Sequence, residues 1–116
     1  MLSILLVEDD PIFAEELQNR LLASVGDVAG VHAASDALTA RQVLAGSIPP
    51  DLAILDLSIP DREGGRPTMK NGVAVIDAIA AQAPRARRVV LDRTSYLEKS
   101  EKDNRTPNLR GILDLV

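Results

Sequence analysis

The sequence predicts an α/β domain built on a parallel β-sheet. Short, almost wholly apolar runs that suit strands alternate with stretches whose apolar residues recur at helical spacing. The strand-like runs are apolar at successive positions, as expected when helices cover both faces of a sheet. With 116 residues and 46% hydrophobic content, the chain is expected to form one domain over residues 1–116.

The first half of the chain predicts two strand-helix units. The first strand is expected over Leu2–Val7, and Asp10-Pro11 is typical of an N-cap followed by proline at the first helical position. The first helix should then span Pro11–Ser24, and a weaker second strand should follow over 28–33. Ser35 is expected to cap a second helix that Pro49-Pro50 ends. The predicted inner faces of these two helices are Phe13, Ala14, Leu17, Leu21 and Val25, and then Leu38, Val43 and Leu44.

The second half continues the alternation. A third strand is expected over 51–57, a helix over 72–83, a fourth strand over 88–91 and a fifth over 111–116. The segment 96–105 is charged and only marginally helical. The helix over 72–83 is predicted to turn one apolar face inward, made of Val73, Ile76, Ile79 and Ala80.

Composition excludes several classes of function. A net charge of −4 argues against a direct nucleic-acid partner, because phosphate backbones attract basic surfaces. The absence of cysteine and the single histidine exclude disulfides and make a zinc site improbable, so any metal should be a hard cation held by oxygen. Apolar runs are far too short to cross a membrane and no secretory leader is apparent, which predicts a cytoplasmic protein.

Acidic residues follow two of the predicted strands. Glu8 and Asp9 come directly after the first strand, and Asp56 closes the third. In parallel sheets the functional crevice lies beyond the carboxyl ends of the strands, so these acids would converge if the two strands are neighbours. Their mutual repulsion would have to be relieved by a proton or a cation, and an oxygen-only ligand set suits Mg²⁺. The alternative, in which strand-end acids only cap helices, is preferred for Asp10.

These motifs resemble the receiver domain of two-component response regulators over essentially the whole chain. The resemblance rests on "ILLVEDDPIFAEELQNRL", "PPDLAILDLSIPD" and "NGVAVIDAI", which combine an acid pair, a strand-three aspartate, a following proline and a helix-opening glycine. It implies a flavodoxin-like, doubly wound sheet of five parallel strands in the order 2-1-3-4-5, in which the usual final helix is expected to be absent. It also implies a phosphoacceptor at Asp56, an acidic pair at Glu8 and Asp9, and Mg²⁺ held by Asp9, Asp56 and the Ser58 backbone carbonyl.

The resemblance further implies a signalling switch rather than an enzyme. Such domains take a phosphoryl group from a histidine kinase or phosphotransfer protein and then change a surface that a downstream protein target reads. One alternative is a pseudo-receiver, which uses the same fold as a phosphorylation-independent binding module. A haloacid-dehalogenase type of enzyme is a weaker alternative, because "LDLS" lacks the second aspartate of that motif.

The sequence departs from the receiver pattern at two positions. Where the family has Thr or Ser at the end of strand four, a strand ending at Leu91 brings Asp92, whereas a longer strand brings Thr94 as the switch hydroxyl. The lysine that the family places at the end of strand five has no counterpart, since Lys99 and Lys102 precede that strand. A sheet without its final helix exposes apolar surface, which predicts self-association as a homodimer.

A third departure is the long loop after Asp56. The insert "SIPDREGGRPTMK" carries Arg62, Arg66 and Lys70 with two adjacent glycines, so it is expected to be mobile and basic. Either it is a lid whose cations replace the missing lysine, or it is a tolerated surface insertion. His32 is expected to be a partly buried structural residue rather than a phosphocarrier.

Overall fold

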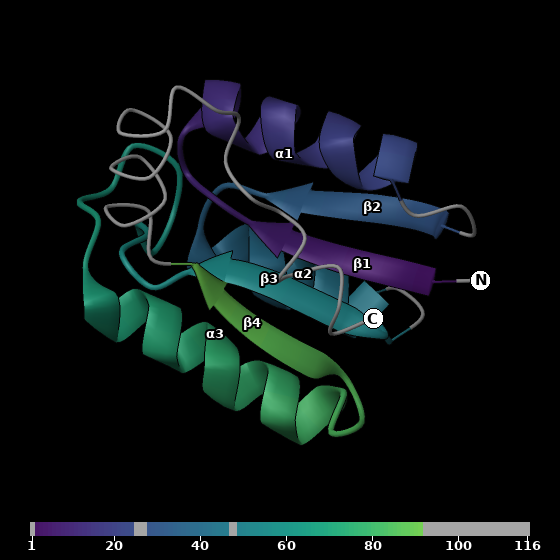
Figure 1. Ribbon diagram of the computed structural model, residues 1–116. Helices are drawn as coiled ribbons and strands as arrows, with labels where there is room; N and C mark the ends of the chain where they lie inside the picture. The colour runs from purple at the N-terminus through teal and green to yellow at the C-terminus, as the bar shows by residue number, and fades with distance from the viewer. Residues whose placement is uncertain (1, 25–27, 47–48, 92–116) are drawn as a thin grey trace.

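The computed structural model, which describes residues 2–24, 28–46 and 49–91, shows a parallel sheet with helices on both faces (Figure 1). The described strands lie in the order β2-β1-β3-β4. This order confirms the predicted α/β fold and the 2-1-3-4 part of the predicted topology. The expected fifth strand, the segment 96–105 and the expected absence of a final helix concern residues outside the described ranges.

The predicted elements are found with small shifts of their ends. The structure has strands β1 (Leu2–Val7), β2 (Val28–Ala34), β3 (Leu52–Asp56) and β4 (Arg87–Leu91), and helices α1 (Pro11–Ser24), α2 (Ala37–Gly46) and α3 (Met69–Gln82). The first strand and the first helix have the predicted bounds. Helix α3 begins three residues before Gly72, since it starts at Met69. Across the described residues, no helix is both long and apolar enough to cross a bilayer.

Two apolar clusters pack on opposite faces of the sheet. On one face, alternate residues of β1 and β3 such as Ile4 and Ile54 pack with Phe13, Leu17 and Leu21 of α1. On the other face, the intervening strand residues pack against α2 and α3, in a cluster that includes Leu5, Val7, Leu55, Ala40, Leu44, Val75 and Ile79. Strands buried on both faces explain why the sequence is apolar at successive positions.

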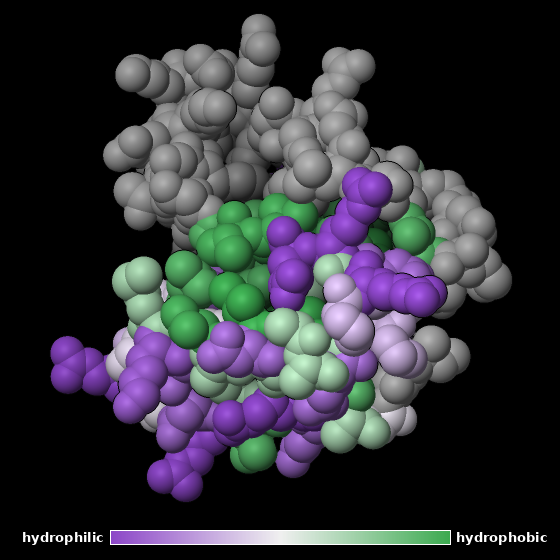
Figure 2. Space-filling model, turned by 90° about the horizontal axis from the view of Figure 1, so that it is seen from below, coloured by the Kyte–Doolittle hydropathy of each residue, from purple (hydrophilic) through white to green (hydrophobic). Residues whose placement is uncertain are grey.

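The inner faces of α2 and α3 differ from those predicted. Helix α2 buries Ala37 and Ala40 with Leu44, while Leu38 is 45% exposed. Helix α3 buries Gly72, Val75 and Ile79, while Val73 is 47% exposed and Ala80 is exposed. The predictions are confirmed for Leu44 and Ile79 and wrong for Leu38, Val73 and Ala80, while Val43 and Ile76 are partly buried and pack against the core cluster. Apolar surface is left on the side where α3 and β4 lie, seen from below in Figure 2.

The N-cap of α2 is Asp36 rather than the predicted Ser35. The Thr39 amide donates a 2.6 Å hydrogen bond to Asp36 Oδ1, and Asp36 Oδ2 accepts from Ser35 Oγ and Thr39 Oγ1 at 3.2 and 3.0 Å. Asp36 is only 2% exposed. Ser35 therefore supports the cap instead of forming it.

Replacing Asp36 by alanine should lower the free energy of unfolding by about 2 kcal/mol, because the cap is lost and three donors are left without their acceptor. Urea unfolding followed by circular dichroism measures the change. Asp36→Asn is the matched control, since its amide oxygen still accepts the Thr39 N–H. An alanine variant as stable as the asparagine variant would contradict the assignment of this cap.

Candidate functional site

Three carboxylates meet where β1 and β3 end. Glu8 and Asp9 follow β1 directly, and Asp56 is the last residue of β3. The two strands are parallel neighbours in which Val7 is level with Leu55, so both sets of acids emerge at the same edge of the sheet. One carboxylate oxygen from each residue lies within 4.8 Å of those of the other two. The convergence predicted for Glu8, Asp9 and Asp56 is therefore present.

Backbone hydrogen bonds hold these acids in place. The Glu8 amide donates to the Ala34 carbonyl of β2 at 3.0 Å, and Glu8 Oε1 accepts from the Asp10 amide at 3.1 Å. Asp56 Oδ1 accepts from the Ser58 amide at 3.0 Å. This bond occupies one carboxylate oxygen of Asp56, and no residue in the described ranges donates to the other.

Asp10 is directed to the helix. Its Oδ1 accepts the amides of Ile12 and Phe13 at 3.0 and 3.2 Å, which caps α1 as predicted. The adjacent Asp9 makes no such bond with the described residues and belongs to the cluster instead. The two neighbouring aspartates thus lie in different surroundings, Asp10 in the helix cap as predicted and Asp9 in the carboxylate cluster.

The cluster is suited to a hard divalent cation. Glu8 is buried at 2% exposure, and Asp9 and Asp56 are partly buried, so three like charges are gathered where water screens them incompletely. All three donors are carboxylate oxygens, the ligand type that Mg²⁺ prefers. Ser58, whose carbonyl is a predicted ligand, is exposed and lies two residues after Asp56. The residues present therefore fit a small cation with room for further ligands.

Helix α3 begins close to the backbone that follows Asp56. A Cβ placed on Gly72 would overlap the backbone of Leu57, whose carbonyl carbon would lie only 2.6 Å away. Gly72 is buried in the first turns of α3. The glycine of the motif is therefore required by close packing of the helix against the strand-end segment, which fixes the backbone next to the cluster.

The long loop after Asp56 is closed at its base. Ile59 and Thr68 form an antiparallel bridge in which the Thr68 amide donates to the Ile59 carbonyl at 3.0 Å. The same carbonyl accepts from Asn71 Nδ2 at 3.0 Å, and the Ile59 side chain is fully buried. Sequence reasoning missed Ile59 and Asn71 as the residues that anchor the loop. The only available signal was an apolar residue within an otherwise polar insert.

The loop also caps a neighbouring helix. The Ala37 and Leu38 amides at the start of α2 donate to the carbonyls of Pro60 and Asp61, at 3.0 and 2.9 Å. A turn in which the Gly65 amide donates to the Arg62 carbonyl then reverses the chain, with Gly64 between them at φ 79°. The expectation of a mobile loop is therefore corrected for its base and for its contact with α2.

The loop's cations stay in solvent. Arg62, Arg66 and Lys70 are exposed, and none forms a salt bridge with another described residue. The expectation for His32 is corrected, because it is exposed on β2 rather than partly buried. Asp92, Thr94, Lys99 and Lys102 lie outside the described residues.

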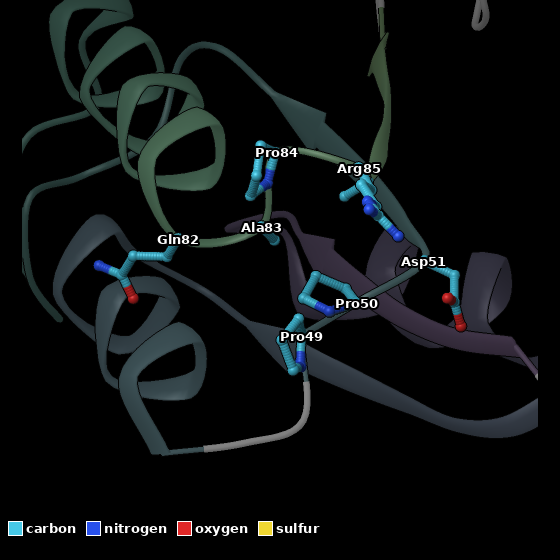
Figure 3. A pocket seen from close by; sticks show the side chains of 8 residues that line it. Pro49, Pro50, Asp51, Gln82, Ala83, Pro84 and Arg85 are labelled. Atoms are coloured by element: carbon cyan, nitrogen blue, oxygen red, sulfur yellow. The ribbon is translucent and has the colours of Figure 1, made fainter.

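A surface hollow of about 370 Å³ lies elsewhere (Figure 3). Its walls are the segment 49–51 that leads into β3 and the segment 82–86 that leads from α3 into β4. These segments precede the strands, whereas the carboxylates follow them. The hollow is therefore at the opposite edge of the sheet and takes no part in the carboxylate cluster.

Several solved structures share this fold. The MaeR response regulator bound to beryllium trifluoride matches with a TM-score of 0.59 and 22% identity over 78% of this chain and 66% of that chain. An aspartate-to-alanine variant of MaeR bound to sulfate matches with a TM-score of 0.60, 20% identity and the same shares of the two chains, 78% and 66%. A LuxR-family two-component response regulator from an Aurantimonas species matches with a TM-score of 0.59 and 24% identity over 78% of this chain and 57% of that chain.

These comparisons bear on the fold. No protein-family model and no curated protein matches the chain. The match spans 66% of the MaeR chain and 57% of the LuxR-family chain, so those proteins are longer than the part shared with this one. At such identity the likeness establishes that this chain folds as response-regulator receiver domains do.

Proposed function

We propose that this chain, which has the receiver fold, is a phosphoacceptor signalling domain of a two-component or phosphorelay system. The observation that carries the proposal is the carboxylate cluster, with Glu8, Asp9 and Asp56 within 4.8 Å at the carboxyl edge of the sheet. Asp56 is the proposed acceptor. One of its oxygens is held by the Ser58 amide, and its other oxygen has no donor among the described residues. That oxygen attacks the phosphorus of the donor as the bond to the donor's leaving group breaks.

The proposed cofactor is Mg²⁺. Asp9, Asp56 and the Ser58 carbonyl would hold it, with Glu8 beside them as the second member of the acidic pair. A bound Mg²⁺ neutralises the repulsion between the attacking carboxylate and the phosphoryl oxygens. The protein's own contribution is to hold the Asp56 side chain against the end of a buried strand, so that little freedom is lost when a donor arrives.

The proposed partners are proteins on both sides of the switch. A histidine kinase or phosphotransfer protein would supply the phosphoryl group, and a downstream protein target would read the altered surface. We place the protein in the cytoplasm, with no direct contact to nucleic acid or membrane. The chain would act as a signalling domain rather than as an enzyme on an external substrate.

A second candidate is a pseudo-receiver that binds proteins without being phosphorylated. Asp56 is level with Leu91 of β4, and the next residue in the sequence is Asp92, an acid where the receiver pattern has a hydroxyl. An acid there would oppose a phosphoryl dianion. The two candidates share the fold and differ in whether Asp56 accepts phosphate.

Incubation with a small acyl phosphate tests the proposal directly. Wild type should give a retarded band on a phosphate-affinity gel when Mg²⁺ is present, and chelation of Mg²⁺ should abolish it. Asp56→Ala should give no such band, because the attacking oxygen is gone. Circular dichroism of both proteins establishes that they are equally folded.

Either of two results would count against phosphorylation at Asp56. A folded wild type that stays unmodified, even with a histidine-phosphorylated donor protein, would favour the pseudo-receiver. Equal retardation of wild type and Asp56→Ala would mean that the phosphoryl group sits on another residue.

A further inference from the structure

Helix α3 carries a second apolar stripe on a flank of the helix, beside the face that it buries. It is formed by four residues spaced alternately four and three apart, namely Met69, Val73, Ile76 and Ala80. Met69 is 62% exposed and Val73 is 47% exposed, Ala80 is exposed, and Ile76 is only partly buried. The alternation of four and three is the heptad spacing with which one helix packs along another.

Met69, Val73 and Ala80 lie outside the core contact of α3, whereas Ile76 is partly buried and packs against the edge of the core cluster. The residues that α3 buries are Gly72, Val75 and Ile79, which lie on a different side of the helix. Val90 of β4 adds to the exposed apolar surface at 47% exposure. It is level with Leu55 and so faces the α3 side of the sheet. Seen from below, apolar side chains gather in one part of the surface, and hydrophilic side chains cover much of the rest (Figure 2).

The segment that follows β4 in the sequence carries few apolar side chains. Residues 92–108 are mostly charged or polar, and Tyr96 and Leu97 are their only large apolar side chains. Apolar residues return only in the run 109–116, part of which is the predicted fifth strand. A stripe running the length of a fourteen-residue helix needs a comparably apolar partner surface.

The charges beside the stripe are self-complementary. Lys70 comes directly after Met69, and Asp77 comes directly after Ile76. Lys70 and Asp77 are seven residues apart, which is two helical turns, so both lie along the same edge of the stripe. Both side chains are exposed, and neither forms an ion pair with a described residue. When two copies of such a helix pack antiparallel, Lys70 of one copy lies along the same edge as Asp77 of the other. The two-fold axis produces this pairing twice.

We propose that the outer stripe of α3 is a homodimer interface, in which two copies of this chain pack their α3 helices antiparallel. Met69 and Val73 of one copy pack against Ala80 and Ile76 of the other, and Lys70 and Asp77 pair twice along one margin of the seam. A second copy fits because the stripe is complementary to itself in both apolar spacing and charge. The interface is separate from the carboxylate cluster and does not depend on phosphorylation.

Sedimentation of the full chain over a range of concentrations tests the interface. Wild type should show a monomer-dimer equilibrium at micromolar concentrations, and Val73→Asp should stay monomeric, because a charge would be buried at the centre of the seam. Leu22→Asp is the matched control, since Leu22 of α1 is exposed to a similar degree, 48% against 47%. It should dimerise like wild type. A wild type that stays monomeric at high micromolar concentration would overturn the proposal.

Charge reversal tests the antiparallel arrangement. Lys70→Glu or Asp77→Lys alone puts like charges together twice, and each should weaken dimerisation about tenfold at low salt. The double variant, Lys70→Glu with Asp77→Lys, restores opposite charges and should dimerise within about twofold of wild type. A double variant no tighter than either single variant would overturn the antiparallel pairing, as would single effects that persist at high salt.

Discussion

Gly72→Ala is expected to destabilise the fold by about 3 kcal/mol or more, through overlap of the new methyl group with the Leu57 backbone. In an exposed helix this change would instead gain about 1 kcal/mol from helix propensity. The overlap prevails because the obstructing atoms are backbone atoms rather than the end of a flexible side chain. The loss is a large share of the roughly 5 to 15 kcal/mol that holds a domain folded.

Thermal unfolding followed by circular dichroism should show a midpoint lowered by roughly 10 °C or more for this variant. Gly30→Ala is the control, because a Cβ placed on Gly30 of β2 would have no atom within 4 Å. Its stability should stay within about 0.5 kcal/mol of wild type. Equal stability of the two variants would show that α3 does not approach Leu57 as closely as described.

The Gly72 contact also illustrates what the sequence reveals and what it leaves open. A glycine after the strand-three aspartate was recognised as part of a motif, but its partner Leu57 was not deducible from spacing. The strands and α1 were predictable because each rests on a local signal, such as the Asp10-Pro11 cap. Local signals suffice where burial is on both faces or where a cap lies next to its helix.

The faces of α3 were not predictable, because the helix has two apolar stripes. Periodicity finds both sets, and nothing local decides which one meets the sheet. The choice is tertiary, since Gly72 packs directly against the Leu57 backbone and turns its side of the helix inward. The cap of α2 has a similar origin. Ser35 and Asp36 are both good caps, and loop carbonyls that accept the Ala37 and Leu38 amides fix where the helix begins.

The candidate site was predictable in its chemistry and only conditionally in its geometry. The residue types pointed to an oxygen-only cation site, but convergence of Glu8, Asp9 and Asp56 required β1 and β3 to be neighbours. Strand order came from the family resemblance and not from periodicity. The anchored loop was missed because its contacts with α2 join residues far apart in the sequence.

Asp9→Asn should weaken Mg²⁺ binding at least about tenfold, because even two unit charges about 4 Å apart attract each other by on the order of 4 kcal/mol near a protein surface, and a ligand of a divalent ion lies closer. The asparagine keeps the size of the side chain and removes only the charge of a proposed ligand. Titration with Mn²⁺ as a paramagnetic substitute, followed by water proton relaxation, measures the affinity without requiring phosphorylation.

Asp10→Asn is the neighbouring control for this effect. This substitution removes the same single negative charge as Asp9→Asn. The Asp10 carboxylate, however, caps α1 through the amides of Ile12 and Phe13, and asparagine caps helices nearly as well. Its affinity for Mn²⁺ should fall by no more than about threefold, the effect of a charge farther from the ion and better screened. If both variants lose affinity equally, the acids act as a diffuse negative surface. If only Asp9→Asn does, the ion is held by the residues that end β1 and β3.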